Sequence, residues 1–179
     1  MNLWLEPLPD TVQIGDRAYP VRTDFRIWVK CGILLEQQQD PFSLAAELLT
    51  LCYPALPPSF EGAVQGILSF YTGGNYIKGD GGKTEKPLYS FAWDGDLIYA
   101  AFYSQYGIDL CDASLHWYQF RALFAGLEDS SRFAAVMEAR EINLSELDSP
   151  GQKAYYRKLK ARYRLPGEAD PAKGLEALF

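Results

Sequence analysis

Residues 112–127 read DASLHWYQFRALFAGL and combine the only histidine of the 179-residue chain with a regular series of aromatic residues. Trp117, Phe120 and Phe124 recur at i, i+3 and i+7, the spacing at which side chains share one face of an α-helix. We therefore predict a helix over residues 112–126 whose aromatic stripe faces the core. Because aromatic side chains bury large apolar areas, this helix is expected to decide how the rest of the chain packs.

His116 permits two interpretations, as a catalytic residue or as a packing residue. A catalytic role requires a partner within hydrogen-bond reach, and adjacent side chains on a helix diverge by about 100°. The polar neighbours are Asp109, Cys111, Asp112 and Ser114. Cys111 precedes the helix and the spacing delivers no dyad, so we predict no catalytic, cofactor-binding or metal-binding residue. The structural anchors that we predict are His116, Trp117, Phe120 and Phe124.

The rest of the chain predicts a hairpin followed by further helices. Residues 11–21, TVQIGDRAYPV, alternate apolar and polar positions around a Gly15-Asp16 turn, which is typical of a β-hairpin. Behind it, residues that commonly cap helices precede apolar residues at helical spacing. These caps are Thr23 or Asp24, Asp40, Ser59, Asp94, Ser130 or Ser131, and Ser149. The helix after Ser59 is expected to bury a stripe that starts at Phe60.

These patterns predict a mainly α fold, a single globular domain of about seven helices with a small N-terminal β-hairpin. The domain is expected to span residues 1–165, with a loose C-terminal tail over residues 166–179. Hydrophobic residues make up 48% of the chain and aromatic residues 15%, a composition that excludes a disordered protein.

The sequence argues against several classes of protein and several kinds of site. The first ten residues lack a basic region and contain two prolines, so we expect no signal peptide, and no apolar run reaches the roughly 20 residues of a membrane-spanning helix. The three cysteines form no CxxC pair, and we expect buried thiols. Residues 81–84, GGKT, match the end of a P-loop, but Ile77 replaces its first glycine, so we predict a solvated loop.

The charge of the chain is unevenly distributed. Residues 1–151 carry 10 basic and 20 acidic side chains, whereas residues 152–164 carry six basic side chains and no acidic one. A helix there would align Tyr156, Leu159 and Tyr163 as a narrow apolar seam, which makes them candidate partner-binding residues. The basic helix could dock on an acidic face of its own protein or of a partner, remain a solvated face, or contact nucleic acid. The acidic body and a pI of about 4.8 oppose the last interpretation.

Five stretches of the chain carry a resemblance to a known family. They are YPVRTDFR (19–26), GILSFYTGG (66–74), LIYAAFYSQYGIDL (97–110), LHWYQFRALFAGL (115–127) and FAAVMEARE (133–141). Over roughly residues 8–165 the chain resembles a Gp15-like family of bacteriophage and prophage proteins, encoded next to the tape-measure gene and regarded as tail assembly chaperones. Its most specific part joins YGIDL, the Leu-His-Trp helix and a later arginine, here Arg140. Tyr118 replaces a tryptophan that is common in that family.

The resemblance implies a non-enzymatic protein of the host bacterial cytoplasm that needs no cofactor. Its expected partner is the tape-measure protein, with tail-tube subunits and further copies of itself as additional candidates, and with neither nucleic acid nor membrane as a partner. A long helical tape-measure chain exposes apolar seams, and grooves that accept amphipathic helices would cover them. The alternatives are a minor structural component retained in the phage tail and, less consistent with a single histidine, an enzyme.

Overall fold

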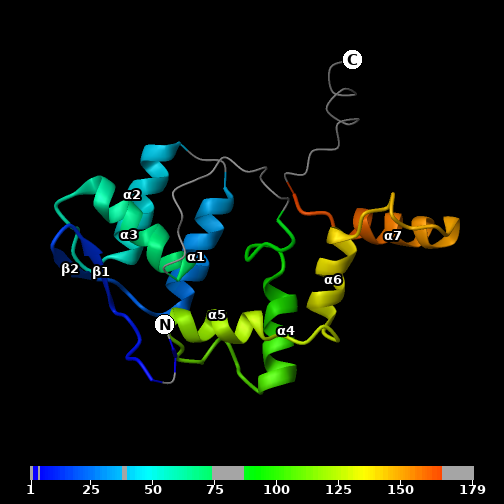
Figure 1. Ribbon diagram of the computed structural model, residues 1–179, viewed down its shortest axis with the longest axis horizontal. Helices are drawn as coiled ribbons and strands as arrows, with labels where there is room; N and C mark the ends of the chain where they lie inside the picture. The colour runs from blue at the N-terminus through cyan, green and yellow to red at the C-terminus, as the bar shows by residue number, and fades with distance from the viewer. Residues whose placement is uncertain (1, 4, 38–39, 74–86, 167–179) are drawn as a thin grey trace, which may run out of the picture. The chain divides into compact units, whose positions relative to one another are not determined.

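The computed structural model describes residues 2–3, 5–37, 40–73 and 87–166. Within these ranges the chain forms seven helices and a two-stranded antiparallel sheet near the N-terminus, which confirms the predicted fold class (Figure 1). The GGKT segment, and the predicted tail beyond Pro166, lie outside the described residues.

Contacts divide the chain into two compact units. The first unit comprises residues 1–85 and 108–126, and the second comprises residues 86–107 and 127–179. The predicted single domain over residues 1–165 stays a prediction.

The predicted hairpin belongs to the first unit. β1 (Thr11–Ile14) pairs antiparallel with β2 (Arg17–Pro20), and Gly15 in the turn between them has a φ of 59°. Glycine adopts this left-handed conformation without the steric cost that a Cβ would impose. The turn therefore forms where the Gly15-Asp16 pair predicts it.

Two glycines of α3 (Phe60–Thr72) let the hairpin lie close to that helix. A Cβ on Gly62 would collide with Cγ2 of Ile14, and a Cβ on Gly66 would lie 3.0 Å from Cγ2 of Val12. The absence of both Cβ atoms permits the close approach, and Val12 is buried in the contact.

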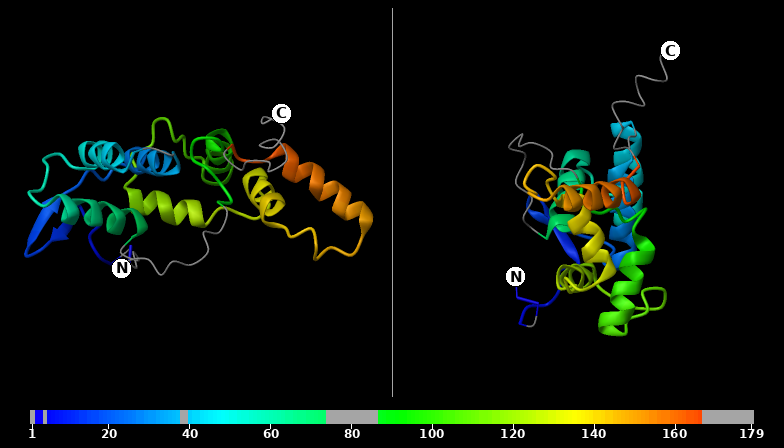
Figure 2. Two further views of the ribbon diagram at one scale, coloured as in Figure 1. Left: turned by 90° about the horizontal axis from the view of Figure 1, so that it is seen from above. Right: turned by 90° about the vertical axis from the view of Figure 1, so that its right-hand side faces the viewer.

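Three helices of the first unit begin at the predicted caps. In each, a side-chain oxygen of the cap residue accepts a hydrogen bond from a backbone N–H of the first turn. The helices and caps are α1 (Phe25–Glu36; Asp24), α2 (Pro41–Cys52; Asp40) and α3 (Ser59). Seen from above, α1 and α2 form one layer, and α3 and α5 (Trp117–Ala125) form a second (Figure 2, left).

Aromatic rings from both layers form the core of the first unit. Trp28 of α1 stacks on Phe70 of α3, with ring centroids 4.6 Å apart, and on Trp117 of α5, with centroids 6.3 Å apart. Phe120 stacks on Trp117 at 5.8 Å and on Phe25 at 4.9 Å. All five side chains are buried, so the stripe that the sequence places on α5 does join the two layers.

The buried face of α3 differs from the predicted stripe. Phe60 is 52% exposed, whereas Phe70, absent from the predicted stripe, is 2% exposed. The buried positions are Ala63, Gly66, Ile67 and Phe70. Because Gly66 must face the hairpin, the helix is rotated so that its first residue turns outward.

The burial of the three cysteines also differs from the expectation. Cys31 and Cys52 are buried, as expected, but Cys111 is exposed because it lies in a turn on the surface. A hydrogen bond with Cys52, together with burial, raises the pKa of the Cys31 thiol. Cys31 therefore keeps its proton, and both buried cysteines pack as part of the core.

The second unit contains three helices, each opened by a residue that the sequence marks as a cap. They are α4 (Gly95–Tyr106; Asp94), α6 (Arg132–Glu141; Ser131) and α7 (Pro150–Arg162; Ser149). α4 lies beside α6, and α6 contacts α7 (Figure 1). Ser131 and Ser149 accept hydrogen bonds from the first turn, but the Asp94 side chain makes no such bond.

Asp94 instead forms an ion pair that holds the second unit together. Its two carboxylate oxygens accept hydrogen bonds from Nη1 and Nη2 of Arg140, at 2.6 and 2.8 Å, and both side chains are at most 10% exposed. Arg140 also donates to the carbonyl of Tyr163 from Nε, at 2.7 Å, and to that of Leu88 from Nη1, at 2.9 Å. A single guanidinium thus connects α4, α6, the end of α7 and the segment before α4.

We predict that Trp117→Ala or Phe120→Ala lowers the free energy of unfolding by about 3 to 5 kcal/mol, because each leaves a cavity among packed rings. Phe124→Ala is the matched control, since Phe124 lies on the same helix but is partly exposed, and its loss is expected to stay below about 2 kcal/mol. Urea denaturation of the full chain measures the difference. Equal losses for the three variants would contradict the assignment of the core.

We predict that Arg140→Met costs about 3 to 5 kcal/mol of unfolding free energy, because it leaves the Asp94 carboxylate buried without a counter-charge. The double variant Asp94→Asn/Arg140→Met removes that charge while keeping an acceptor for the Ser90 N–H, which donates to Asp94 at 2.9 Å. It should therefore be more stable than the Arg140→Met variant, by about 1 to 2 kcal/mol. A double variant less stable than the single one would refute this role of the pair.

Candidate functional site

α5 begins later than the sequence predicts. The predicted helix over residues 112–126 is wrong at its start, because residues 109–113 form a turn in which Asp109 accepts hydrogen bonds from the backbone N–H groups of Cys111 and Ala113. The residue that caps α5 is His116, and the helix runs from Trp117 to Ala125. Histidine is an uncommon cap, so pattern alone favoured the aspartate.

Both nitrogens of the His116 ring are engaged. Nδ1 accepts a hydrogen bond from the backbone N–H of Tyr118 at 3.0 Å, which requires the ring proton to be on Nε2. Nε2 lies 2.9 Å from the carbonyl oxygen of Pro9 and donates to it in this tautomer. In return, the side chain of Gln119 accepts from the backbone N–H of His116 at 3.0 Å. The imidazole therefore caps a helix and fastens the N-terminal segment to it.

The other predicted anchors lie on the same helix. The indole N–H of Trp117 donates to the carbonyl of Tyr71 at 3.0 Å, and the ring stacks on the Tyr71 ring at 5.3 Å. Phe120 is buried, and Phe124 stacks on it at 5.8 Å while remaining partly exposed. The four residues thus share one edge of the aromatic core, and the imidazole packs against the rings of Phe70 and Tyr118.

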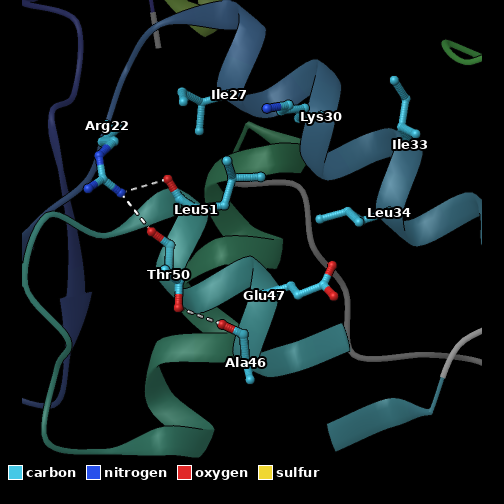
Figure 3. A pocket seen from close by; sticks show the side chains of 9 residues that line it. All are labelled: Arg22, Ile27, Lys30, Ile33, Leu34, Ala46, Glu47, Thr50 and Leu51. Carbon is cyan, nitrogen blue, oxygen red and sulfur yellow. Dashed lines mark hydrogen bonds between the residues drawn. The ribbon is translucent and has the colours of Figure 1, made fainter. Parts of the chain in front are cut away.

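An open, mostly apolar groove lies between α1 and α2 in the first unit. It encloses about 860 Å³. Figure 3 shows side chains of α1 on one wall and side chains of α2 on the other. The wall residues are Ile27, Lys30, Ile33 and Leu34 from α1, and Ala46, Glu47, Thr50 and Leu51 from α2. Apart from Arg22 at one end, the ionisable groups that line it are Lys30 and Glu47, one on each wall.

Arg22 closes one end of this groove. Its Nη1 donates to the carbonyls of Thr50 and Leu51, each at 2.8 Å (Figure 3). The same atom donates to the carbonyl of Tyr53 at 2.8 Å, and the backbone N–H of Arg22 donates to the carbonyl of Cys52. A cation at the C-terminus of a helix satisfies its last carbonyls and complements its dipole. Arg22 therefore positions α2 against the segment that leads into α1, and thereby sets the shape of the groove.

Two further apolar side chains on the groove helices are exposed, although they do not line the groove. Leu35, at the end of α1, is 38% exposed, and Phe42, at the start of α2, is 78% exposed. The sequence assigned neither residue to a site, because periodicity shows which positions are apolar but not which face a neighbouring element leaves uncovered.

The predicted partner-binding seam lies on the side of α7 that contacts α6. The hydroxyl of Tyr156 donates to Glu138 at 3.4 Å, and the carbonyl of Tyr163 accepts from Arg140. The nearby Glu138 carboxylate raises the pKa of Tyr156. Helical spacing places Leu159 on the same side, and all three residues stay partly exposed. Contact with a partner through this seam stays a prediction.

Two tyrosines of the first unit, one buried and one partly buried, have pKa values raised further from neutrality. Burial, followed by the charge of Cys52, raises the pKa of Tyr53 to about 12, and its hydroxyl donates to the carbonyl of Ala63 at 2.9 Å. Burial likewise raises the pKa of Tyr118, against the opposing effect of Arg121. Such hydroxyls keep their protons at neutral pH and act as donors within the fold.

Two further observations concern the described residues as a set. They contain no group of three or more His, Cys, Asp or Glu side chains placed to hold a metal ion. No helix within the same ranges is long and apolar enough to cross a lipid bilayer.

We predict that His116→Ala lowers the free energy of unfolding by about 1 to 2 kcal/mol, through loss of the cap and of the bond to Pro9. His116→Asn is the matched variant, because asparagine can still cap α5 but cannot reach Pro9, and it should recover about half of that loss. Chemical denaturation separates the two variants. Equal stability of His116→Ala and the unmodified protein would contradict the capping role.

Comparison with protein families gives one match that covers most of the chain. The family described as Bacteriophage Gp15 protein matches residues 5–165, a range that includes both units and the five stretches quoted above. Comparison with curated proteins and with solved structures gave no significant match. On the strength of this match, the chain belongs to the bacteriophage Gp15 protein family.

Proposed function

We propose that this protein is a tail assembly chaperone that binds the tape-measure protein in the host cytoplasm during tail morphogenesis and catalyses no reaction. The observation that carries the proposal is the open apolar groove between α1 and α2 in a member of a bacteriophage family. The resemblance to tail chaperones supplies the identity of the partner, and tail-tube subunits are a second candidate partner.

The groove has the geometry that helix-in-groove recognition uses. Its walls are two neighbouring helices whose partly exposed apolar residues recur at helical spacing, so a third amphipathic helix can pack its ridges between them. The tape-measure protein, a long and largely helical chain, would present such seams before a tail tube encloses it. Covering them one segment at a time would suppress aggregation.

Partial exposure of the wall residues suits temporary binding. Ile33, Leu34 and Leu51 are neither buried nor fully exposed, so each gains only part of its transfer free energy when a partner covers it. The resulting contacts are individually weak, and a polymerising tube can displace them. A permanent interface would be expected to offer a larger apolar surface.

We predict that co-expression keeps the tape-measure protein soluble, that the two proteins purify together, and that Leu34→Glu abolishes both effects by placing a charge in the groove. Leu56→Glu is the matched control, because Leu56 is 65% exposed and does not line the groove. Circular dichroism should show that both variants remain folded. A tape-measure protein that is equally soluble without this protein would refute the proposal.

Mass spectrometry of purified virions and of infected lysate separates the chaperone from its alternative. A chaperone is expected to be abundant in the lysate and absent from the virion. Stoichiometric presence in the virion would instead favour a minor structural component retained in the phage tail.

A further inference from the structure

The outward face of α7 is strongly cationic and unlike the rest of the protein. Between Gln152 and Arg164 the chain has six basic residues and no acidic one. Arg157, Lys158, Arg162 and Arg164 are exposed, and Lys153 and Lys160 are partly exposed. α7 has no buried residue, so only one of its sides is used for packing within the second unit.

The inward side of α7 is already engaged by α6. The ammonium group of Lys160 donates to the carbonyl of Arg140 at 2.5 Å, and Tyr156 and Tyr163 make the contacts described above. These bonds hold the orientation of α7 against α6 and leave the opposite side facing outward.

The outward side presents an aromatic ring between cations. Tyr155 is 59% exposed, and Lys158 and Arg162 follow it at i+3 and i+7, so the three side chains form one stripe. Arg157 and Lys158 make no hydrogen bond or ion pair within the described part of the chain. An exposed aromatic ring flanked by cations is the composition of an interface anchor.

This arrangement of like charges destabilises the isolated α7 helix. Lys153 and Arg157, like Lys158 and Arg162, are like charges at i and i+4, a spacing that destabilises a helix by about 0.2 to 0.5 kcal/mol per pair. The first turn also lacks an acidic residue that would complement the helix dipole. Contact with an anionic surface would reduce this repulsion between like charges. The outward stripe of α7 therefore has the properties of an interaction surface.

The remainder of the same chain supplies such a surface. Residues 1–151 carry a net charge of −10, which disfavours binding of the protein to a nucleic acid or an anionic membrane but attracts the α7 of another molecule. The exposed carboxylates of the first unit include Asp10, Asp16, Glu47, Glu61 and Asp112. Two of its arginines, Arg22 and Arg26, direct their donors to backbone carbonyls.

We propose that the outward face of α7, centred on Tyr155, Lys158 and Arg162, docks on the acidic surface of residues 1–151 of a second copy of this chain. The two surfaces differ, so the contact is heterologous and joins copies head to tail. It does not depend on the proposed binding of the tape-measure protein. Because the pairing is between exposed charges, it is weak and sensitive to salt.

Sedimentation velocity of the full chain over a range of protein concentrations tests the proposal. Association should strengthen with concentration, and its dissociation constant should rise about tenfold or more between about 0.05 M and about 0.5 M salt. Association that is independent of salt, or a monomer at every concentration in low salt, would overturn it.

Two charge-reversal variants with the same net charge separate α7 from a general charge effect. Arg157→Glu/Lys158→Glu removes two cations from the outward face and should weaken self-association at least about tenfold. Arg17→Glu/Arg132→Glu changes the net charge equally but makes the acceptor surface more acidic, so it should leave association unchanged or strengthen it. Equal weakening by both variants would contradict a specific role of α7.

A mixing experiment tests the head-to-tail geometry. The labelled Arg157→Glu/Lys158→Glu variant keeps the acceptor surface, so it should still bind the unmodified protein although it does not bind itself. Failure to bind the unmodified protein would exclude a heterologous contact. Binding of the unmodified protein to a single-stranded oligonucleotide or to anionic phosphatidylserine vesicles is the competing outcome. If that binding is salt-sensitive and is lost in the same variant, and if the protein does not self-associate, the face binds a polyanion and the proposal is overturned.

Discussion

The first unit depends on a short backbone contact between two segments that are far apart in the sequence. Trp117 donates its backbone N–H to the carbonyl of Thr23 at 2.8 Å, and Phe25 donates to Leu115 at 3.1 Å, so that Asp24 and His116 form an antiparallel bridge. Both bridged residues are helix caps, of α1 and α5 respectively. The contact therefore places the first turns of two helices side by side and brings their aromatic residues into register for stacking.

Arginines reinforce this framework through backbone carbonyls more than through acidic side chains. Arg26 donates to the carbonyls of Leu110 and Cys111, at 2.8 and 2.7 Å, and thereby holds the turn before α5 against the start of α1. Arg22 donates in the same way to carbonyls at the end of α2, and Arg140 donates to a carbonyl at the end of α7. A guanidinium offers five donors in a rigid fork, so one side chain can satisfy several carbonyls at a chain end. Both Arg22 and Arg26 lie in YPVRTDFR, one of the stretches that resemble the family.

Local chemistry made much of the fold predictable. A glycine turn, alternating apolar residues and side-chain caps act over a few residues, so the hairpin and the starts of α1, α2, α3, α6 and α7 follow from the sequence. The errors occur where a distant partner competes with a local rule. Asp112 is a better cap than His116 in isolation, yet the bridge to Asp24 starts α5 at Trp117. Asp94 has the position of a cap, but a distant guanidinium engages its carboxylate.

The candidate groove shows the same limit. Apolar residues on α1 and α2 are visible in the sequence, but which of their faces stays uncovered depends on how the hairpin, α3 and α5 occupy the other side. The three carbonyl partners of Arg22 lie about thirty positions along the chain, beyond the reach of local sequence pattern. Sequence pattern found the helices that form the groove and could not find the groove itself.

The hydrogen bonds of the sole imidazole have a consequence for how this protein could acquire new chemistry. The lone pair that a metal ion or a substrate proton would need is already directed at a backbone amide, and the opposite nitrogen is committed to a carbonyl. Freeing the ring would first require the opening turn of α5 to unwind and the segment around Pro9 to detach. The histidine works as a fixed spacer between peptide groups.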